Sequence, residues 1–258
     1  MKVSVFSPAF NASKTISGLI KELDDVYVIF GRRGYEMSAL LINDNSTDET
    51  RAILDCAQKD FKWLNIYHNE KNLGNAANIL VGYHWGVNSG AQVVGCLDSD
   101  GEHSPYAMIR HLQIIEQGEC DGVSGSIIFP EHDVLNHSDR NMMRFWGGVQ
   151  SDMAGIDGRF YIQSPGYNLH KADRVEKALG LFDKYKEFYA ANTAEPFPKW
   201  GMHGVMIHLI AVGAEAHIKA AYLECFGKSP NRTPDKLILQ SNAANAHAAM
   251  LAKFLPKK

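Results

Sequence analysis

The sequence has little cysteine and no long apolar run, and both shortages exclude classes of protein. No two cysteines have CxxC spacing, so we expect free, buried thiols in a reducing cytoplasm rather than a zinc site or a disulfide framework. The cysteines are Cys56, Cys96, Cys120 and Cys225. No segment reaches the roughly 18 apolar residues of a membrane-spanning helix. The opening MKVSVFSPAF lacks the apolar core of a secretory signal, and we expect a cytoplasmic protein.

The sequence also has no excess of charge of either sign. Lys and Arg number 26 and Asp and Glu 29, for a net charge of −3. We therefore expect no nucleic-acid partner, and any anionic ligand must be held by local groups. The motifs of P-loop nucleotide triphosphatases, dinucleotide-binding folds and HExxH zinc enzymes are missing. What is present is an ordinary globular composition, 45% hydrophobic and 21% charged, at a length that fits one large domain.

Short β-rich runs alternate with helical patterns in the first half of the chain. The expected strands are residues 3–7, 38–44, 63–69, 92–98 and 121–129. A helix follows the first strand, because Ile16, Leu19, Ile20 and Leu23 have the spacing of one helix face. Strands that alternate with helices indicate βαβ units. The pattern predicts an α/β fold with a doubly wound, mostly parallel sheet flanked by helices.

Two short motifs indicate where helices of the first half begin. Ser46 with Glu49 has the spacing of a capping box, and Ser104 before Pro105 is typical of a helix start.

The second half of the chain is less regular. Residues 131–160 indicate a mixture of loop and helix over the carboxyl edge of the sheet, a natural place for an acceptor site. The expected elements beyond them are a strand at 160–170, helices near 171–191 and 202–213, a strand at 216–225 and a helix at 235–255.

Three polar clusters follow the expected strands, at residues 7–11, 43–46 and 98–100. Ligands of open α/β sheets bind outside the carboxyl ends of the strands. Each cluster alone is also typical of turns and helix caps, and for Asn11 or Asp44 taken singly that alternative stays open. Three clusters at one edge favour a binding site.

Asp98, Asp100 and Glu102 alternate along an expected extended stretch, so their side chains are expected to project to one side. Carboxylates that lie so close together repel one another unless a cation lies among them. Oxygen-only ligands suit Mg²⁺ or Mn²⁺, which usually complete their shells with water and substrate phosphates. The trio therefore predicts a metal site for a nucleotide diphosphate. The alternative is a solvated acidic turn.

Four segments, SPAFNASKTI, INDNSTDET, the NLG of NEKNLGNAANILVG, and LDSDGEHSP, occur in the order and spacing of a known family. Over about 130 residues the chain resembles family 2 glycosyltransferases, which have the GT-A fold. The LDSDGEHSP form, SPGYNLHKADRVEKAL and the segment from VMIHLIAVG to GKSPNRT resemble the polyprenyl-phosphate sugar transferases of the dolichol-phosphate mannose synthase type. The resemblance implies a single domain, residues 1–258, in which 1–130 bind the nucleotide-sugar and 131–258 the acceptor.

The resemblance also implies roles for residues of the first half. Those implied to bind the nucleotide-sugar are Pro8, Phe10, Asn11, Asp44, Asn72, Gly74, Asp98 and Ser99, with Asp44 hydrogen-bonded to the base. Asp98, Asp100 and Glu102 would hold the metal. The metal would neutralise charge that builds on the leaving nucleoside diphosphate.

The second half departs from the family pattern at the expected general base. Many members have a Glu-Asp pair near the start of a late helix, and this chain has Met202 and His203 there. His203 is a candidate base; a metal or phosphate contact and a local hydrogen bond remain alternatives. The other candidate contacts to an acceptor or a phosphate are Arg140, Arg144, Arg159, Arg174 and His208.

We therefore expect a metal-dependent, inverting glycosyltransferase of polysaccharide or glycan synthesis. Transfer to a saccharide hydroxyl, with His203 as base, ranks slightly ahead of transfer to a polyprenyl phosphate, which is already ionised and needs no base. The partners are a nucleotide-sugar donor and a glycan or lipid-linked acceptor, and the basic tail FLPKK allows peripheral contact with the inner face of a membrane. A non-catalytic sugar-nucleotide binding module remains open. A sugar-phosphate nucleotidyltransferase is disfavoured, since SPAFNASKT is not the Gly-rich basic loop such enzymes need.

Overall fold

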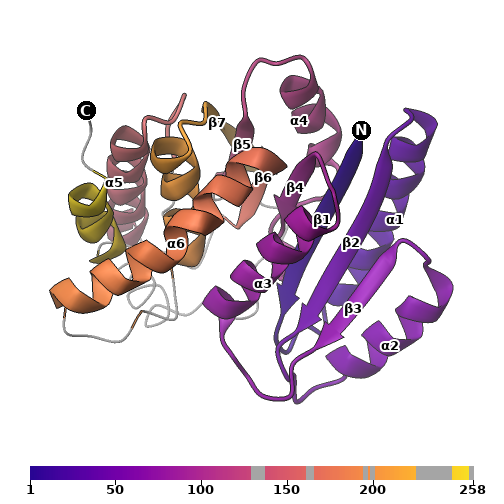
Figure 1. The fold of residues 1–258 in the computed structure, drawn as a ribbon. Coiled ribbons are helices and arrows are strands. Elements are labelled where there is room, and N and C mark those ends of the chain that lie inside the picture. The colour runs from indigo at the N-terminus through magenta and orange to yellow at the C-terminus, as the bar shows by residue number, and fades with distance from the viewer. Residues whose placement is uncertain (129–136, 161–165, 194–196, 198–200, 225–245, 256–258) are drawn as a thin grey trace.

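The computed structural model shows one seven-stranded sheet with helices on both of its faces (Figure 1). It describes residues 1–128, 137–160, 166–193, 197, 201–224 and 246–255. The strand order is β3-β2-β1-β4-β6-β5-β7. The strands are β1 (Lys2–Ala9), β2 (Glu36–Asn43), β3 (Leu64–His68), β4 (Val93–Cys96), β5 (Gly122–Ile128), β6 (Tyr167–Lys171) and β7 (Ile218–Glu224).

All neighbouring strands pair in parallel except at β6, which runs antiparallel to both β4 and β5. The ends of β1, β2, β3 and β4 therefore share one edge of the sheet, and the beginning of β6 lies at that same edge. The strands of the first half of the chain (β1 to β5) and those of the second half (β6 and β7) therefore belong to one continuous sheet. The mostly parallel sheet predicted from the sequence is confirmed.

The helices form a layer on each face of the sheet. Their bounds are α1 (Ile16–Arg32), α2 (Thr50–Asp60), α3 (Asn75–Asn88), α4 (Ala107–Glu116), α5 (His137–Ala154), α6 (Ala172–Thr193), α7 (Met202–His208) and the π-helical turn η1 (Leu209–Gly213). Residues 246–254 form one more helix. Apolar residues of α1, α2 and α4 share one buried cluster with the sheet, and those of α3, α6, α7 and the last helix share the other. Within the described residues, no helix is both long and apolar enough to cross a membrane.

Local sequence patterns explain why several helices lie where they do. Ile16, Leu19 and Leu23 are buried on one face of α1, as their spacing predicted. On α3, glycines replace the apolar residues that would otherwise hold the helix away from the sheet. A Cβ on Gly82 would lie 2.0 Å from the ring of Phe6 in β1. Close packing of α3 therefore depends on the absence of that side chain.

The two expected helix starts have different outcomes. The capping box of Ser46 and Glu49 is wrong: Glu49 makes no cap hydrogen bond, the Thr50 N–H at the start of α2 donates to Asp48, and the Ser46 hydroxyl accepts a hydrogen bond from the Asn11 N–H. The Ser104 hydroxyl accepts a hydrogen bond from the Tyr106 N–H at 3.4 Å, as expected of a helix start, and it also donates to Glu22 of α1. Turns that begin at Ser104 and Pro105 lead into α4 at Ala107. Sequence spacing alone reveals neither the Ser46 contact between two loops nor the Ser104 contact with α1.

The cysteine prediction holds in part. The three cysteines that the structure describes are free thiols. Cys96 and Cys120 are buried, and burial raises the pKa of both thiols. Cys56 is exposed on α2, contrary to the expectation of burial. Cys225 and the segment 235–245 of the expected last helix lie outside the described residues.

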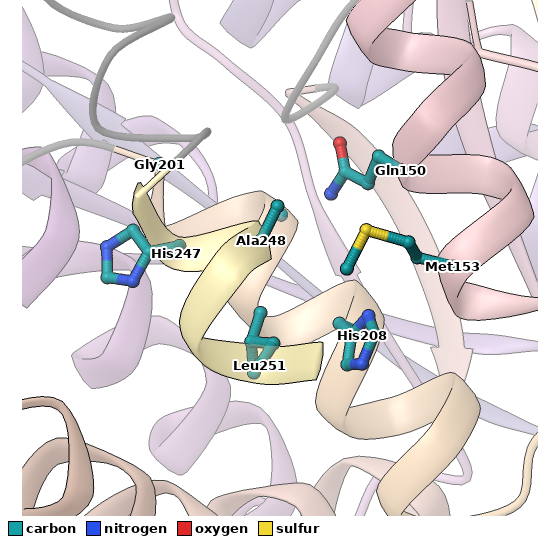
Figure 2. A pocket seen from close by; sticks show the side chains of 8 residues that line it. Gln150, Met153, Gly201, His208, His247, Ala248 and Leu251 are labelled. Atoms are coloured by element: carbon teal, nitrogen blue, oxygen red, sulfur yellow. The ribbon is translucent and has the colours of Figure 1, made fainter. Parts of the chain in front are cut away.

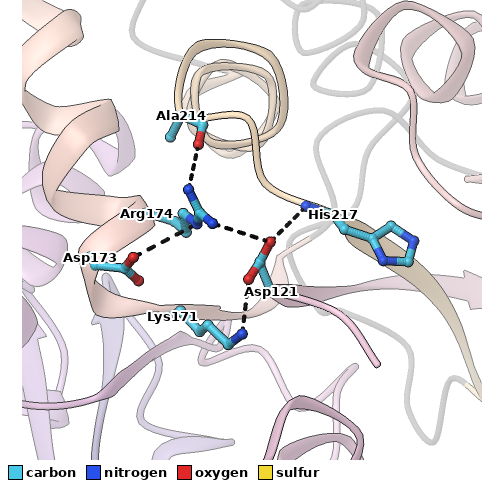
Figure 3. Close-up of polar contacts among 6 residues, drawn as sticks. All are labelled: Asp121, Lys171, Asp173, Arg174, Ala214 and His217. Atoms are coloured by element: carbon cyan, nitrogen blue, oxygen red, sulfur yellow. Dashed lines mark hydrogen bonds and ion pairs between the residues drawn. The ribbon is translucent and has the colours of Figure 1, made fainter. Parts of the chain in front are cut away.

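A polar cluster at the opposite edge of the sheet joins Asp121 of the first half to residues of the second half (Figure 3). The Asp121 carboxylate, just before β5, accepts hydrogen bonds from the Lys171 ammonium at 2.9 Å and the His217 N–H at 3.0 Å. Arg174 lies 3.8 Å from the same carboxylate and donates to the Ala214 carbonyl. Burial alone would raise the pKa of Asp121, but the Lys171 hydrogen bond and the neighbouring charges lower it.

We predict that Asp121→Asn lowers the free energy of unfolding at pH 7 by about 1–2 kcal/mol, because it removes the charge that these donors face. A lowered folded-state pKa stabilises the protein above the unfolded value near 3.9 and loses that effect as the pH falls through the folded value. Urea unfolding should therefore show the gap at pH 7 and a much smaller one near pH 3.

Asp173→Asn serves as the control, since that side chain is 63% exposed beside the same Arg174. It should change the free energy of unfolding by less than about 0.5 kcal/mol. An Asp121 variant as stable as the wild type at pH 7 would contradict the assignment.

Candidate active site

A cavity of about 320 Å³ opens at the carboxyl edge, beside the ends of β1 and β4. Its walls include four residues expected from the sequence to lie at the site: Phe10, Asn11, Ser99 and Asp100. The other residues that line it are Ala12, Ser13, Lys14, Thr15 and Asp48. The segment from Phe10 to Thr15, between β1 and α1, therefore forms much of the wall.

Hydrogen bonds hold this segment against the loop that follows β2. The Asn11 side-chain oxygen accepts a hydrogen bond from the Thr47 N–H at 2.9 Å, while the Asn11 N–H donates to the Ser46 hydroxyl at 3.0 Å. Asn11 has a φ of 51°, a left-handed conformation that Asn tolerates better than most residues. The reciprocal pair explains why a short amide occupies this turn.

Asp48 adds a second link between the two loops. One carboxylate oxygen accepts a hydrogen bond from the Ser13 N–H, and the other accepts from the N–H and hydroxyl of Thr50. Burial raises the pKa of Asp48, but the hydrogen bonds from Thr50 and Ser13 outweigh it and lower the pKa to about 2. Asp48 lies in the INDNSTDET segment but was not among the predicted site residues. Its position two residues before Thr50, at a helix start, is the sequence signal that could have identified it.

Asp44 holds the loop that follows β3. Its buried carboxylate accepts hydrogen bonds from the N–H groups of Leu73 and Gly74 and from the Asn69 amide, at 2.7 to 2.9 Å. The Asn72 side chain donates to the Asp44 carbonyl. The structure thus brings the predicted trio of Asp44, Asn72 and Gly74 together, next to the cavity edge rather than among its lining residues. The predicted contact between Asp44 and a base stays a prediction.

Three other predicted site residues lie in or directly after β1 or at the start of α3. Pro8 is buried within β1, in register with Ile42 of β2. Phe10 is exposed at 47% and faces the cavity region. Gly74 has a φ of 84° at the start of α3, a conformation that favours glycine.

The acidic trio does not have the expected extended form. β4 ends at Cys96, and Gly101, with a φ of 81°, turns the chain. The Glu102 N–H donates to the Asp100 carboxylate at 3.1 Å, and the Glu102 side chain is buried. Among the residues that the structure describes, no three His, Cys, Asp or Glu side chains gather as a metal site. The extended form expected for this stretch is therefore wrong, whereas metal binding by Asp98, Asp100 and Glu102 stays a prediction.

His203 lies beside Asp98, although the two are 105 residues apart. The distance from His203 Nε2 to Asp98 Oδ1 is 3.3 Å, and His203 is 4% exposed. An ionised carboxylate only accepts hydrogen bonds, so Nε2 is the donor in this pair. Nδ1 is buried and has no hydrogen-bond partner among the described residues. The Nε2 atom of His203 is therefore engaged as a donor to Asp98.

His208 lies away from this pair, in a small cavity of about 10 Å³ between α5, α7 and the last helix (Figure 2). Gln150 and Met153 of α5 and His247 of the last helix line the same cavity. A space of this size holds at most about one water molecule. The contact between His208 and a phosphate stays a prediction, but this cavity does not have room for a phosphate group.

The predicted arginines fall in three different places. Arg159 is 66% exposed beside Asp152 of α5, with its guanidinium packed over Gly148. Arg140 and Arg144 belong to α5, but their side chains lie outside the described residues. The inclusion of Arg174 is wrong, because it pairs with Asp121 at the opposite edge of the sheet (Figure 3).

Residues 4–174 match the family model "Glycosyl transferase family 2". The match covers more than half of the chain, which therefore belongs to glycosyl transferase family 2. It is 28% identical over 166 residues to a polyprenol monophosphomannose synthase of Mycolicibacterium smegmatis, a match over 60% of either chain. It is 23% identical over 181 residues to an undecaprenyl-phosphate mannosyltransferase of Micrococcus luteus, over 70% of either chain. The chain thus spans less than two thirds of the mycobacterial synthase.

Solved glycosyltransferases share the fold. A glucosyl-3-phosphoglycerate synthase from Mycobacterium tuberculosis, solved with phosphoglyceric acid, aligns over 100% of this chain and 81% of its own, with a TM-score of 0.65 and 14% identity. A mannosyltransferase from Pyrobaculum calidifontis, solved with GDP-Man and Mn²⁺, aligns over 97% and 74% with a TM-score of 0.55 and 14% identity. These likenesses confirm the GT-A fold predicted from the sequence.

We predict that Asp48→Ala weakens the cavity wall, because it removes the acceptor shared by Ser13 and Thr50. Loss of these hydrogen bonds should lower the free energy of unfolding by about 1–3 kcal/mol and raise the donor KM about tenfold. Urea unfolding and initial-rate kinetics measure the two effects. Asp60→Ala, exposed at the end of α2, should change neither. An Asp48→Ala protein with normal donor KM would show that the two loops need no such link.

Proposed function

We propose that this glycosyltransferase moves a sugar from a nucleotide diphosphate donor to the phosphate of a polyprenyl phosphate. The names of both curated relatives support this acceptor. The observation in the structure that carries the proposal is the contact between His203 and Asp98. A saccharide hydroxyl needs a base to take its proton, whereas a phosphate monoester is already ionised. His203 uses Nε2 to donate to Asp98, so it suits the acceptor that needs no base.

This proposal reverses the order expected from the sequence, in which a saccharide hydroxyl ranked ahead with His203 as base. The lipid phosphate is proposed to bind where the two halves of the chain meet, near Asp98 of the first half and His203 of the second half. Peripheral contact with a membrane would bring such an acceptor within reach. Transfer of a sugar to a polyprenyl phosphate does not require the role in polysaccharide or glycan synthesis that the sequence led us to expect.

The donor is proposed to occupy the cavity at the carboxyl edge. Phe10 offers an aromatic face for the nucleoside. Backbone and side chains of the segment from Asn11 to Thr15 line the same space. Asp44 fixes the loop at Leu73 and Gly74, and so shapes the neighbouring edge. The nucleotide base and the sugar are left to experiment.

A divalent cation fits the donor groups at this edge. Asp98 and Asp100 supply two carboxylates, and Asp100 lines the cavity. Mg²⁺ or Mn²⁺ is commonly held by one or two carboxylates together with substrate phosphates and water. We therefore assign the ion to Asp98 and Asp100 and leave out Glu102, which is buried in the turn. When bound, the ion would offset negative charge on the leaving nucleoside diphosphate.

We predict sugar transfer to a polyprenyl phosphate and none to the matching polyprenol, because the alcohol lacks the ionised nucleophile. The assay supplies GDP-mannose, GDP-glucose, UDP-glucose and UDP-N-acetylglucosamine in turn, with Mn²⁺ and detergent, and follows radiolabel into the lipid phase. Oligosaccharides replace the lipid in a parallel reaction. Transfer to an oligosaccharide hydroxyl, with no lipid product from any donor, would overturn the proposed acceptor.

We predict that Asp100→Asn reduces kcat by about 100-fold or more, since the amide no longer offers a full charge to the ion. Excess EDTA should abolish wild-type turnover, and Mn²⁺ should restore it. Asp183→Asn, exposed on α6, is the matched control and should keep wild-type turnover. Wild-type rates that persist in EDTA would remove the cation from the proposal.

A further inference from the structure

We propose that Gly166 and His203 are positioning residues that hold the Asp98 carboxylate in one orientation. The inference rests on the proposed role of Asp98 at the donor diphosphate. Both residues belong to the second half of the chain, whereas Asp98 follows β4 in the first half. The second half would then help to build the donor site as well as the acceptor site.

Gly166 contacts Asp98 through both its backbone and its missing side chain. The Asp98 N–H donates to the Gly166 carbonyl at 3.1 Å. A Cβ built on Gly166 would lie 1.9 Å from Asp98 Oδ2 and 2.4 Å from Cγ. Gly166 is not among the glycines with a left-handed φ, so space rather than backbone conformation requires glycine here. Any larger residue must push the Asp98 carboxylate out of its place.

His203 contacts the other oxygen of the same carboxylate. Its Nε2 lies 3.3 Å from Asp98 Oδ1, whereas the position of a Gly166 Cβ lies against Oδ2. The imidazole is itself fixed, since His203 is buried at the second position of α7. A donor on one oxygen and a close backbone on the other restrict rotation of the carboxylate about its last bond.

A carboxylate held in advance does not have to be ordered when the ligand binds. Ordering a free side chain would cost part of the binding energy, and small displacements of catalytic groups reduce rates strongly. The two contacts therefore favour donor affinity without touching the donor. This distinguishes a positioning role from a direct one, in which His203 would contact the acceptor or take a proton.

The test is a double-mutant cycle between Gly166→Ala and Asp98→Ala. The probes are GDP and UDP, each with Mn²⁺, with affinity measured by isothermal titration calorimetry. Gly166→Ala alone should weaken the better-bound nucleotide about tenfold or more, because the new methyl group displaces the carboxylate. In the Asp98→Ala background the same change should cost less than about twofold, since no carboxylate remains to be displaced.

Melting temperature gives a second cycle that needs no ligand. Gly166→Ala should lower the melting temperature of the wild type and should lower that of the Asp98→Ala protein much less. The matched control is Gly180→Ala on α6, where a Cβ would meet nothing within 4 Å. It should alter neither nucleotide affinity nor the coupling.

His203 is tested by rescue. A Gln side chain can donate an N–H to Asp98, whereas Ala cannot. His203→Gln should therefore keep nucleotide affinity closer to the wild type than His203→Ala does. Equal losses in the two variants would exclude positioning by His203.

Additive effects of Gly166→Ala and Asp98→Ala, in both nucleotide affinity and melting temperature, would overturn the inference for Gly166. Failure of the proposed acceptor would look different. The protein would not glycosylate polyprenyl phosphate, yet the coupling between Gly166 and Asp98 would remain.

Discussion

The antiparallel pairing of β6 with β4 is the constraint on which the candidate site depends. Because β6 runs against its neighbours, its first residues lie beside the last residues of β4, with Asn168 in register with Cys96. Two positions further along each strand, Gly166 and Asp98 meet at the carboxyl edge. A parallel β6 would have placed its start at the opposite edge, where Asp121 precedes β5. The reversal of one strand brings the second half of the chain to the carboxylate of the first.

The carboxylates at the carboxyl edge of the sheet have two different roles. Asp44 and Asp48 accept hydrogen bonds from backbone N–H groups of neighbouring loops, so they shape the cavity and have little capacity left for a ligand. Asp100 lines the cavity, and Asp98 lies 3.3 Å from His203. A nucleoside diphosphate carries several negative charges, so it can approach carboxylates only where cations balance them. Lys14 in the cavity wall and the proposed divalent ion meet that requirement.

Sequence patterns predicted the elements well wherever the signal is local. The helix expected from the spacing of Ile16, Leu19, Ile20 and Leu23 is found as α1, because that apolar face is buried against the sheet. Local patterns could not reveal the direction of β6 or the meeting of His203 with Asp98, which depend on distant pairing. The extended form expected for the acidic trio was wrong for a related reason. Alternation predicts one face only if the chain stays extended, and Gly101 turns it. Arg174 was misplaced because charge alone says nothing of which edge of the sheet a residue occupies.

The most direct test of this account is a crystal structure of the protein grown with Mn²⁺ and GDP or UDP. Anomalous scattering would locate the manganese independently of the protein density. The account predicts an anomalous peak next to the Asp98 and Asp100 carboxylates, in contact with a diphosphate, with the nucleoside between Phe10 and the loop held by Asp44. A nucleotide bound elsewhere, or a manganese peak away from both carboxylates, would contradict it.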